Sequence, residues 1–150
     1  MFKKILYPTD FSDVSAKVIP YIKQLKEGGT KEVIVLHVLD AHLLEAAHGY
    51  LSSKSFDSFH SLRHEGILEN LRRIEEELKE EGLEVKTIIK DGIPLREILK
   101  VEMEEDVLMI VIGSHGMSNL EEVFLGSVSE KVIRKSKKPV LVIKRACQGE

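Results

Sequence analysis

The sequence predicts one α/β domain, in which a doubly wound parallel sheet carries helices on both faces. Two apolar runs, at residues 32–39 and 107–112, lack the polar alternation of half-buried strands, which is typical of strands buried on both faces. Segments with helical periodicity separate the strand-like runs, and this alternation favours right-handed strand-helix-strand units. With 150 residues, the chain has the size of a single domain with a substantial core.

The first third of the chain predicts strand, helix and strand. Residues 4–7 form a short apolar run that ends at Pro8. After a loop at residues 8–12, a helix is expected because apolar side chains recur at helical spacing, at Val14, Val18, Tyr21, Ile22 and Leu25. Gly28 and Gly29 end that helix. The run at residues 32–39 is the second strand, and within it His37 is expected to be hydrogen-bonded.

The periodicity weakens in the next segment. Residues 52–61 are polar and rich in serine, so we predict a mobile excursion or lid over residues 40–61. Helical spacing returns at Ile67, Leu71, Ile74 and Leu78, and the opposite face of this helix is charged and expected to be solvated. Gly82 ends this helix.

The last third again alternates strands and helices. Residues 83–89 predict a strand. Asp91 and Gly92 then predict a turn, and Pro94 predicts the start of a helix. Residues 107–112 predict the next strand. A further helix is expected from Val128 until Pro139 breaks it, followed by a last strand at residues 140–143.

Residues 113–127 predict an anion site between a strand and a helix. Gly113, Gly116 and Gly126 have no Cβ, so ligand oxygens can approach the backbone closely, and Gly126 is expected to adopt positive φ. Ser127 and Glu130 form the pattern of a capping box, which predicts free N–H groups at the start of the following helix. Each glycine alone is more often a plain turn. The loop matches neither the Walker A pattern nor the dinucleotide-binding glycine pattern.

The glycine spacing resembles the ATP-binding signature of the universal stress protein family. The matching pattern is Gly113-x-x-Gly116, nine residues, then Gly126-Ser127. Residues 3–12 and 138–145 are similar to that family's first strand and loop and to its last strand. The resemblance implies a Rossmann-like sheet of five strands in the order 3-2-1-4-5, with ATP or ADP bound together with Mg²⁺ or Mn²⁺.

The resemblance also implies which residues contact the nucleotide. Pro8 and Thr9 are expected on the adenine side, and the main chain of Val38 is expected to read the adenine edge. Asp10 is expected to accept hydrogen bonds from the ribose hydroxyls, and its alternative role is that of a helix cap. The ribose and phosphate contacts are expected from Ile112, Gly113, His115, Gly116, Gly126, Ser127, Val128 and Ser129. Met117 replaces the Lys or Arg that family members often carry.

Three functions are compatible with this pattern. The preferred one is an ATP-binding regulatory module of the stress protein type, in which the nucleotide is a conformational ligand. The alternative is an enzyme on the same fold, either a slow ATPase or an adenylyl transferase. The third is a protein that has kept the fold and dimerises without binding nucleotide. The resemblance implies a homodimer through the last strand.

Composition and the remaining motifs give further expectations. The net charge of −3 indicates neither nucleic acid nor membrane as a partner. A single cysteine, Cys147, and the lack of an apolar leader favour a cytoplasmic location. His60 and His64 lie four residues apart, but no third ligand is assured, so neither a metal site nor a catalytic residue is assigned.

Overall fold

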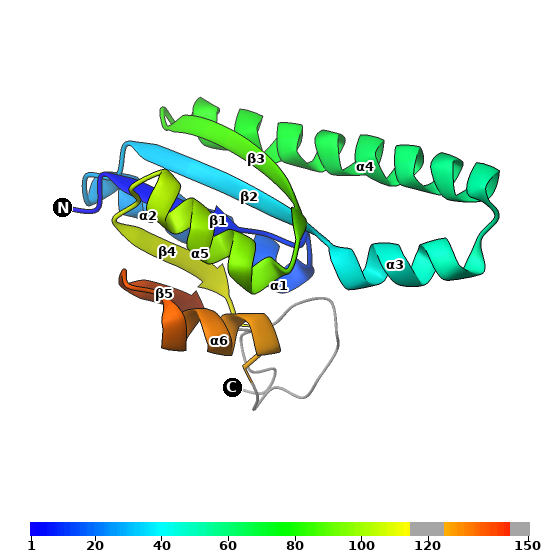
Figure 1. Cartoon of the computed structure of the whole chain (residues 1–150). Helices are drawn as coiled ribbons and strands as arrows, with labels where there is room; N and C mark the ends of the chain where they lie inside the picture. Colours follow the sequence, from blue (N-terminus) through cyan, green and yellow to red (C-terminus); the bar gives the residue numbers. More distant parts are fainter. Residues whose placement is uncertain (115–124, 145–150) are drawn as a thin grey trace, which may run out of the picture.

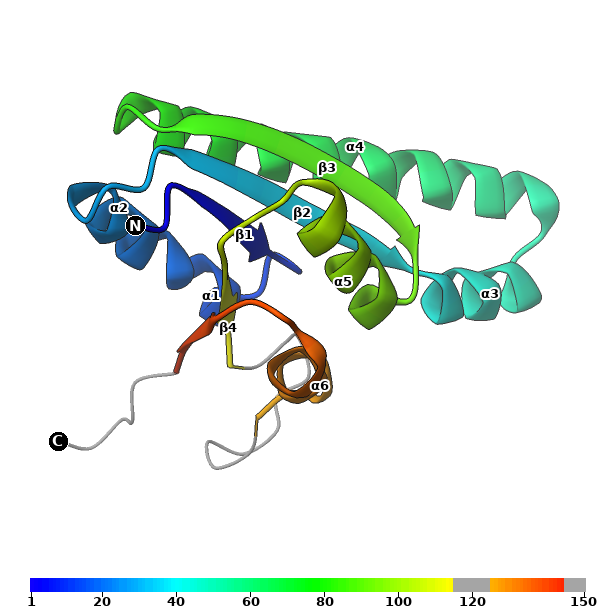
Figure 2. The same cartoon turned by 60° about the vertical axis from the view of Figure 1, so that its left-hand side comes forward.

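Five parallel strands form the sheet of this protein. The computed structural model describes residues 1–114 and 125–144. The strands are β1 (Lys4–Pro8), β2 (Glu32–Asp40), β3 (Glu84–Gly92), β4 (Met109–Gly113) and β5 (Val140–Ile143). Their order is β3-β2-β1-β4-β5, and every pairing is parallel. The predicted fold class and strand order are confirmed, with β3 and β5 at opposite edges (Figure 2).

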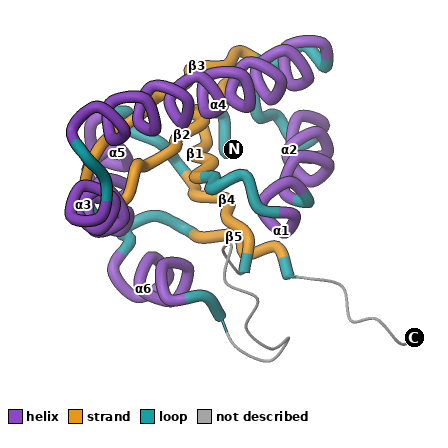
Figure 3. Tube along the Cα trace, turned by 90° about the vertical axis from the view of Figure 1, so that its right-hand side faces the viewer, coloured by secondary structure: helices purple, strands orange, loops and turns teal. Residues whose placement is uncertain are grey.

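Helices cover both faces of the sheet. They are α1 (Asp13–Ala16), α2 (Val18–Glu27), α3 (Ala41–Tyr50), α4 (Ser53–Glu80), α5 (Pro94–Glu104) and α6 (Ser127–Lys135). The strands pass between α5 and α6 on one side and α1 and α2 on the other (Figure 3). Helices α2 and α4 pack on one buried cluster that includes Tyr7 and Val35. Helices α5 and α6 pack on a second cluster that includes Leu6 and Ile34.

The central strands are apolar because both of their faces are covered. All five residues of β4 are buried, as are the last four of β1. Leu6 of β1 lies opposite Ile34 of β2 and Ile110 of β4, so three neighbouring strands supply one layer of the second cluster. This burial explains why residues 107–112 show no polar alternation.

The segment predicted as a mobile excursion or lid, residues 40–61, is mostly helical. The Asp40 side chain accepts a hydrogen bond from the His42 N–H and caps α3, and the Ser52 hydroxyl accepts one from the Ser55 N–H and caps α4. Against the described part of the chain, α3 buries none of its residues. Its Leu44 packs, half-buried, against the cluster that includes Tyr7 and Val35, and so small a contact face leaves little apolar periodicity to reveal the helix. Together α3 and the start of α4 extend past the sheet (Figure 1).

Several predicted boundaries also differ. The first expected helix is two helices, since Lys17 ends α1 before α2 begins. Asp91 and Gly92 form no turn but continue β3, because β2 runs on to Asp40 and offers them partners. The last helix ends at Lys135, before the predicted break at Pro139.

Within residues 1–114 and 125–144, no helix combines the length and the apolar character needed to cross a bilayer.

Candidate functional site at the carboxyl edge of the sheet

The ends of β1 and β4 lie next to each other at the middle of the carboxyl edge. The two strands pair through Leu6 and Ile110, so Pro8 and Ile112 follow at corresponding positions. After β1 the chain continues into α2 on one face, whereas the helix that follows β4, α6, lies on the other face (Figure 3). This divergence is the topological switch point at which doubly wound sheets bind ligands.

Buried hydrogen bonds fix the loop that follows β1. The Thr9 N–H donates to the Leu36 carbonyl at 2.8 Å, which ties the loop to β2. The Thr9 hydroxyl oxygen Oγ1 lies 2.6 Å from Ser15 Oγ and accepts from the Phe11 N–H at 3.0 Å. The Tyr7 hydroxyl donates to the Ser15 carbonyl at 2.7 Å, and burial raises the pKa of Tyr7 above its ordinary value. The hydroxyl groups that hold the loop therefore keep their protons at neutral pH.

Asp10 occupies a short polar turn rather than a helix cap. Its Oδ1 accepts from the Ser12 N–H at 2.9 Å, whereas Ser12 itself caps α1 by accepting from the Ser15 N–H. The second carboxylate oxygen, Oδ2, makes no hydrogen bond to the described residues. Asp10 is half-buried. One oxygen thus fixes the orientation of the carboxylate, and the other remains available to a hydroxyl donor.

His37 is hydrogen-bonded, as predicted, and it supports the same loop. Its Nδ1 lies 2.8 Å from the Thr9 carbonyl oxygen, which can only accept, so Nδ1 carries the proton. The ring stacks on Phe11, with centroids 4.5 Å apart. Burial lowers the pKa of His37, an effect that nearby Arg63 reinforces and that Thr9 and Asp10 oppose. The imidazole is therefore neutral at neutral pH.

Val38 presents backbone groups toward the site. The carbonyl of Leu36 faces β1, since it accepts from Thr9. Backbone groups alternate in direction along a parallel strand, so those of Val38, two residues later, point to the same side. There β1 has already ended at Pro8. The N–H and C=O of Val38 consequently face space that no strand of the described residues occupies.

Gly113 joins three elements at the end of β4. Its carbonyl accepts from the Ser129 hydroxyl of α6 at 2.7 Å. A Cβ built on Gly113 would lie 3.2 Å from Val14 Cγ1 and 3.3 Å from the Ser15 backbone nitrogen, both in α1. The close packing of α1 therefore favours glycine at this position.

The first turn of α6 lies beside this strand end. The Gly126 N–H donates to the Ser114 carbonyl at 2.7 Å, and Gly126 is the N-cap of the helix. Ser127, Val128 and Ser129 are its first three residues, and within the described residues their N–H groups have no hydrogen-bond acceptor. Such a helix start attracts anions.

Two expectations for this turn are wrong. Ser127 is inside the helix and makes no capping bond, because Gly126 takes the N-cap position. Gly126 has φ of −58°, which any residue can adopt, so positive φ is not the reason for glycine. The predicted contacts His115 and Gly116 lie outside the described residues.

Sequence reasoning missed Phe11, Tyr7 and Ser15. All three take part in the contacts that hold the loop after β1. The apolar run and the serine-rich start of the helix made Tyr7 and Ser15 look like ordinary core and helix residues. The positive φ of Phe11, 63°, has no signal in the sequence.

The strand order and the switch point define a doubly wound, Rossmann-like α/β protein. The sequence model of the universal stress protein family matches residues 1–144. The chain belongs to the universal stress protein family.

Individual relatives agree with this assignment. Universal stress protein MJ0577 of Methanocaldococcus jannaschii is 42% identical, over 97% of this chain and 96% of its own length. Its solved structure superimposes with a TM-score of 0.88, covering 97% of this chain and 98% of that one. Universal stress protein YxiE of Bacillus subtilis is 36% identical, over 96% of this chain and 100% of its own length.

Two more distant structures contain nucleotides. A universal stress protein in complex with cAMP is 21% identical to this chain and covers 95% of it, with a TM-score of 0.68. A family member from Arabidopsis thaliana with AMP bound is 19% identical and covers 97% of this chain, with a TM-score of 0.65. This chain in turn covers 97% of the cAMP-bound structure and 93% of the AMP-bound structure, so the likeness extends over the whole fold.

Proposed function

We propose that this protein is a regulatory module that binds an adenine nucleotide, ATP or ADP, as a conformational ligand. The observation that carries the proposal is the convergence of three kinds of group at one switch point. They are the Asp10 carboxylate, the outward backbone groups of Val38, and the first N–H groups of α6. The cAMP and AMP complexes of fold relatives support nucleotide binding by this fold.

Each group suits one part of the nucleotide. The Val38 N–H and C=O offer one donor and one acceptor, which the edge of adenine can match, beside Pro8 and Thr9. The Asp10 carboxylate accepts from two ribose hydroxyls. The N–H groups of Ser127, Val128 and Ser129 donate to phosphate oxygens, close to the end of β4 at Ile112 and Gly113. His115, Gly116 and Gly126 complete the proposed set.

The nucleotide would bring its own Mg²⁺ or Mn²⁺. Among residues 1–114 and 125–144, no group of three or more His, Cys, Asp or Glu side chains could hold a metal ion. A divalent cation on phosphates keeps several waters and needs few protein ligands. The donor set of this edge therefore fits a cation that enters with the phosphates.

We propose that the nucleotide is held rather than rapidly consumed. Fast hydrolysis needs a positioned base and cations at the transferred phosphoryl group. In the described part of the site, Asp10 is engaged with Ser12 and neutral His37 with Thr9. Backbone N–H groups bind ground-state phosphate without accelerating chemistry by that alone. A slow ATPase or adenylyl transferase on the same edge is the second candidate.

Titration calorimetry with Mg²⁺ tests this function. We expect the protein to bind ATP in preference to GTP, because guanine presents a different donor and acceptor pattern to Val38. Asp10→Asn retains an acceptor for Ser12 but removes the charge, and it should weaken ATP binding by about 1.5–3 kcal/mol. Phosphate release from the same samples should be far slower than the ~10 per second typical of enzymes.

The alternative outcomes are distinct. Equal affinity for ATP and GTP, or no heat with either, would overturn the adenine nucleotide proposal. Turnover near about 1 per second or faster would instead favour the enzyme on the same fold. Thermal melting of Asp10→Asn in the absence of nucleotide shows whether the turn after β1 is intact.

We also propose a homodimer through β5. This strand is an edge of the sheet, and its residues Val140, Leu141 and Val142 are half-exposed. The carbonyls of Pro139 and Ile143 face β4, so the alternating backbone groups of Val140 and Val142 face outward. Within the described residues these outward backbone groups have no partner, and an apolar edge of this kind is suited to pairing with a second copy.

A further inference from the structure

Phe11 has a backbone conformation that bulky residues seldom adopt. Its φ is 63°, in the left-handed region where a Cβ crowds the backbone. The strain of such a residue persists only where its surroundings fix it, and strained residues concentrate at binding sites. Phe11 directly follows Asp10, the residue proposed to bind ribose.

Aromatic stacking and two polar contacts hold this conformation. The Phe11 ring lies on the His37 imidazole at an interplanar angle of 21° and packs against the cluster under α2 and α4. The Phe11 N–H donates to Thr9 Oγ1 at 3.0 Å. His37 is fixed in turn by its bond to the Thr9 carbonyl. One end of the stack thus belongs to β2 and the other to the loop.

The turn of Asp10 encloses Phe11. Asp10 Oδ1 accepts from the Ser12 N–H, so this hydrogen bond spans the strained residue. Phe11 lines a cavity of about 150 Å³ between β1, α2 and α4, together with Tyr7, Ile19 and Ile74, and Asp10 is not part of that lining. The two adjacent side chains therefore have separate surroundings, and the lining around Phe11 is mostly apolar although Asn70 and Arg73 also belong to it. Any change of φ at Phe11 would rotate Asp10 relative to Ser12.

We infer that Phe11 is a positioning residue of the nucleotide site: its stack on His37 holds the strained turn that aims the Asp10 carboxylate at the ribose. This inference rests on the proposed function. It makes Phe11 important for recognition of the ribose hydroxyls and unimportant for recognition of the phosphates, which α6 binds.

The test compares ATP with 2′,3′-dideoxy-ATP, which lacks both ribose hydroxyls. The wild type is expected to bind ATP about ten- to a hundredfold more tightly than the dideoxy analogue, the scale of hydrogen bonds to a charged group. Phe11→Gly allows positive φ but has no ring. It should bring the ratio of the ATP affinity to the dideoxy-ATP affinity close to one, while it leaves the affinity for the analogue unchanged. Phe11→Tyr can stack and should retain the ratio.

A double-mutant cycle separates positioning from folding. If Phe11 acts through Asp10, Phe11→Gly in the Asp10→Asn background should cause no additional loss of ATP affinity. Phe11→Leu, which fills the apolar space without stacking, should also lose the preference for ATP over the dideoxy analogue. This variant replaces Phe11→Gly in the test if the glycine variant does not fold. An unchanged ratio in Phe11→Leu, or equal losses for both ligands, would overturn the inference. Absence of ATP binding by the wild type would overturn the proposed function instead.

Discussion

His37 connects pH to stability through its burial. Its folded pKa lies below the ordinary 6.5, so between the folded pKa and 6.5 the unfolded chain binds more protons than the folded one. Stability therefore rises with pH through this window, and acidification from neutral pH should lower the free energy of unfolding. The neutral ring that donates to Thr9 is the state that the fold requires.

Urea unfolding between pH 7.5 and 5 measures this effect. The measured pH range stays above 4.5, the ordinary pKa of a glutamate, so the lowered pKa values of Glu69 and Glu105 cause their separate loss of stability at lower pH. His37→Asn, whose side-chain amide can donate near the same position, should flatten the dependence. His42→Asn, on the exposed face of α3, is the control. A slope that His37→Asn leaves intact would assign the effect to other groups.

Gly113 has a packing role that can be separated from ligand binding. In Gly113→Ala the new Cβ meets the α1 backbone at 3.3 Å, so α1 must shift. We expect a loss of about 1–3 kcal/mol of stability without nucleotide, the range for overpacking a core. Gly66→Ala in α4 is the matched control, because a Cβ there meets nothing within 4 Å and should stabilise by up to about 1 kcal/mol. Equal unfolding midpoints for the two variants would contradict the packing role.

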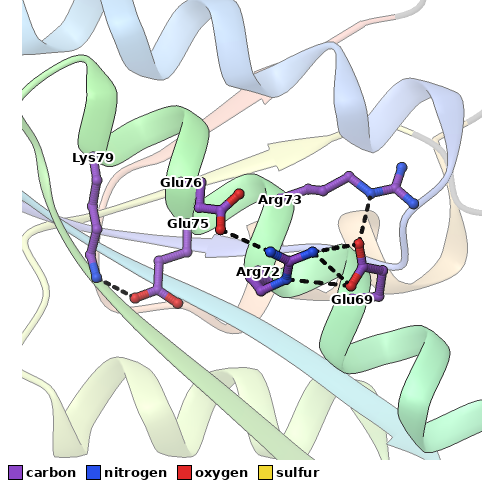
Figure 4. Close-up of polar contacts among 6 residues, drawn as sticks. All are labelled: Glu69, Arg72, Arg73, Glu75, Glu76 and Lys79. Carbon is purple, nitrogen blue, oxygen red and sulfur yellow. Dashed lines mark hydrogen bonds and ion pairs between the residues drawn. The ribbon is translucent and has the colours of Figure 1, made fainter.

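At the scale of the element, α4 shows which of its faces stabilises the protein. Leu71 is 3% exposed and belongs to the cluster under α2 and α4. Its neighbour Arg72 lies on the solvent face, where it pairs with Glu69 at 2.8 Å and Glu76 at 3.0 Å (Figure 4). Arg73 joins Glu69 at 3.7 Å, and Lys79 pairs with Glu75 (Figure 4). Water and salt weaken exposed ion pairs. The contribution of a buried leucine comes from apolar burial and does not depend on charge.

Two adjacent substitutions in α4 test this contrast. Leu71→Ala should lower the free energy of unfolding by about 2–5 kcal/mol, because it removes buried methyl groups and leaves a cavity. Arg72→Ala should change the unfolding midpoint little, and 1 M salt should remove any difference from the wild type. A large, salt-independent loss in Arg72→Ala would mean that the ion pairs of α4 are structural.

At the scale of the molecule, the exposed edge at β5 predicts assembly. Sedimentation velocity should detect a dimer of the wild type. Val142→Pro removes an N–H that faces outward while leaving the groups that pair with β4, so it should yield a folded monomer. A wild type that stays monomeric at every concentration would contradict the proposed dimer, and a dimer that persists in Val142→Pro would place the interface elsewhere.

The sequence by itself determined the elements whose side chains are buried on regular faces. The β4 run is apolar because helices cover both of its sides, and Leu71 and Leu78 mark the buried stripe of α4, so composition and periodicity revealed both. The glycine spacing, through its resemblance to a family, also gave the strand order. These signals are local, since each depends on residues close together in the chain.

The tertiary structure alone decided what depends on contacts between distant residues. Against the described part of the chain, helix α3 fully buries no residue and packs through half-buried Leu44, so its cap at Asp40 and its place after β2 are what reveal it. Gly113 is restricted by the α1 backbone, about a hundred residues earlier in the chain. The positive φ of Phe11 is held by His37 of another strand. Strain and close approach arise only when separate segments meet in the fold, and for that reason no local pattern could predict them.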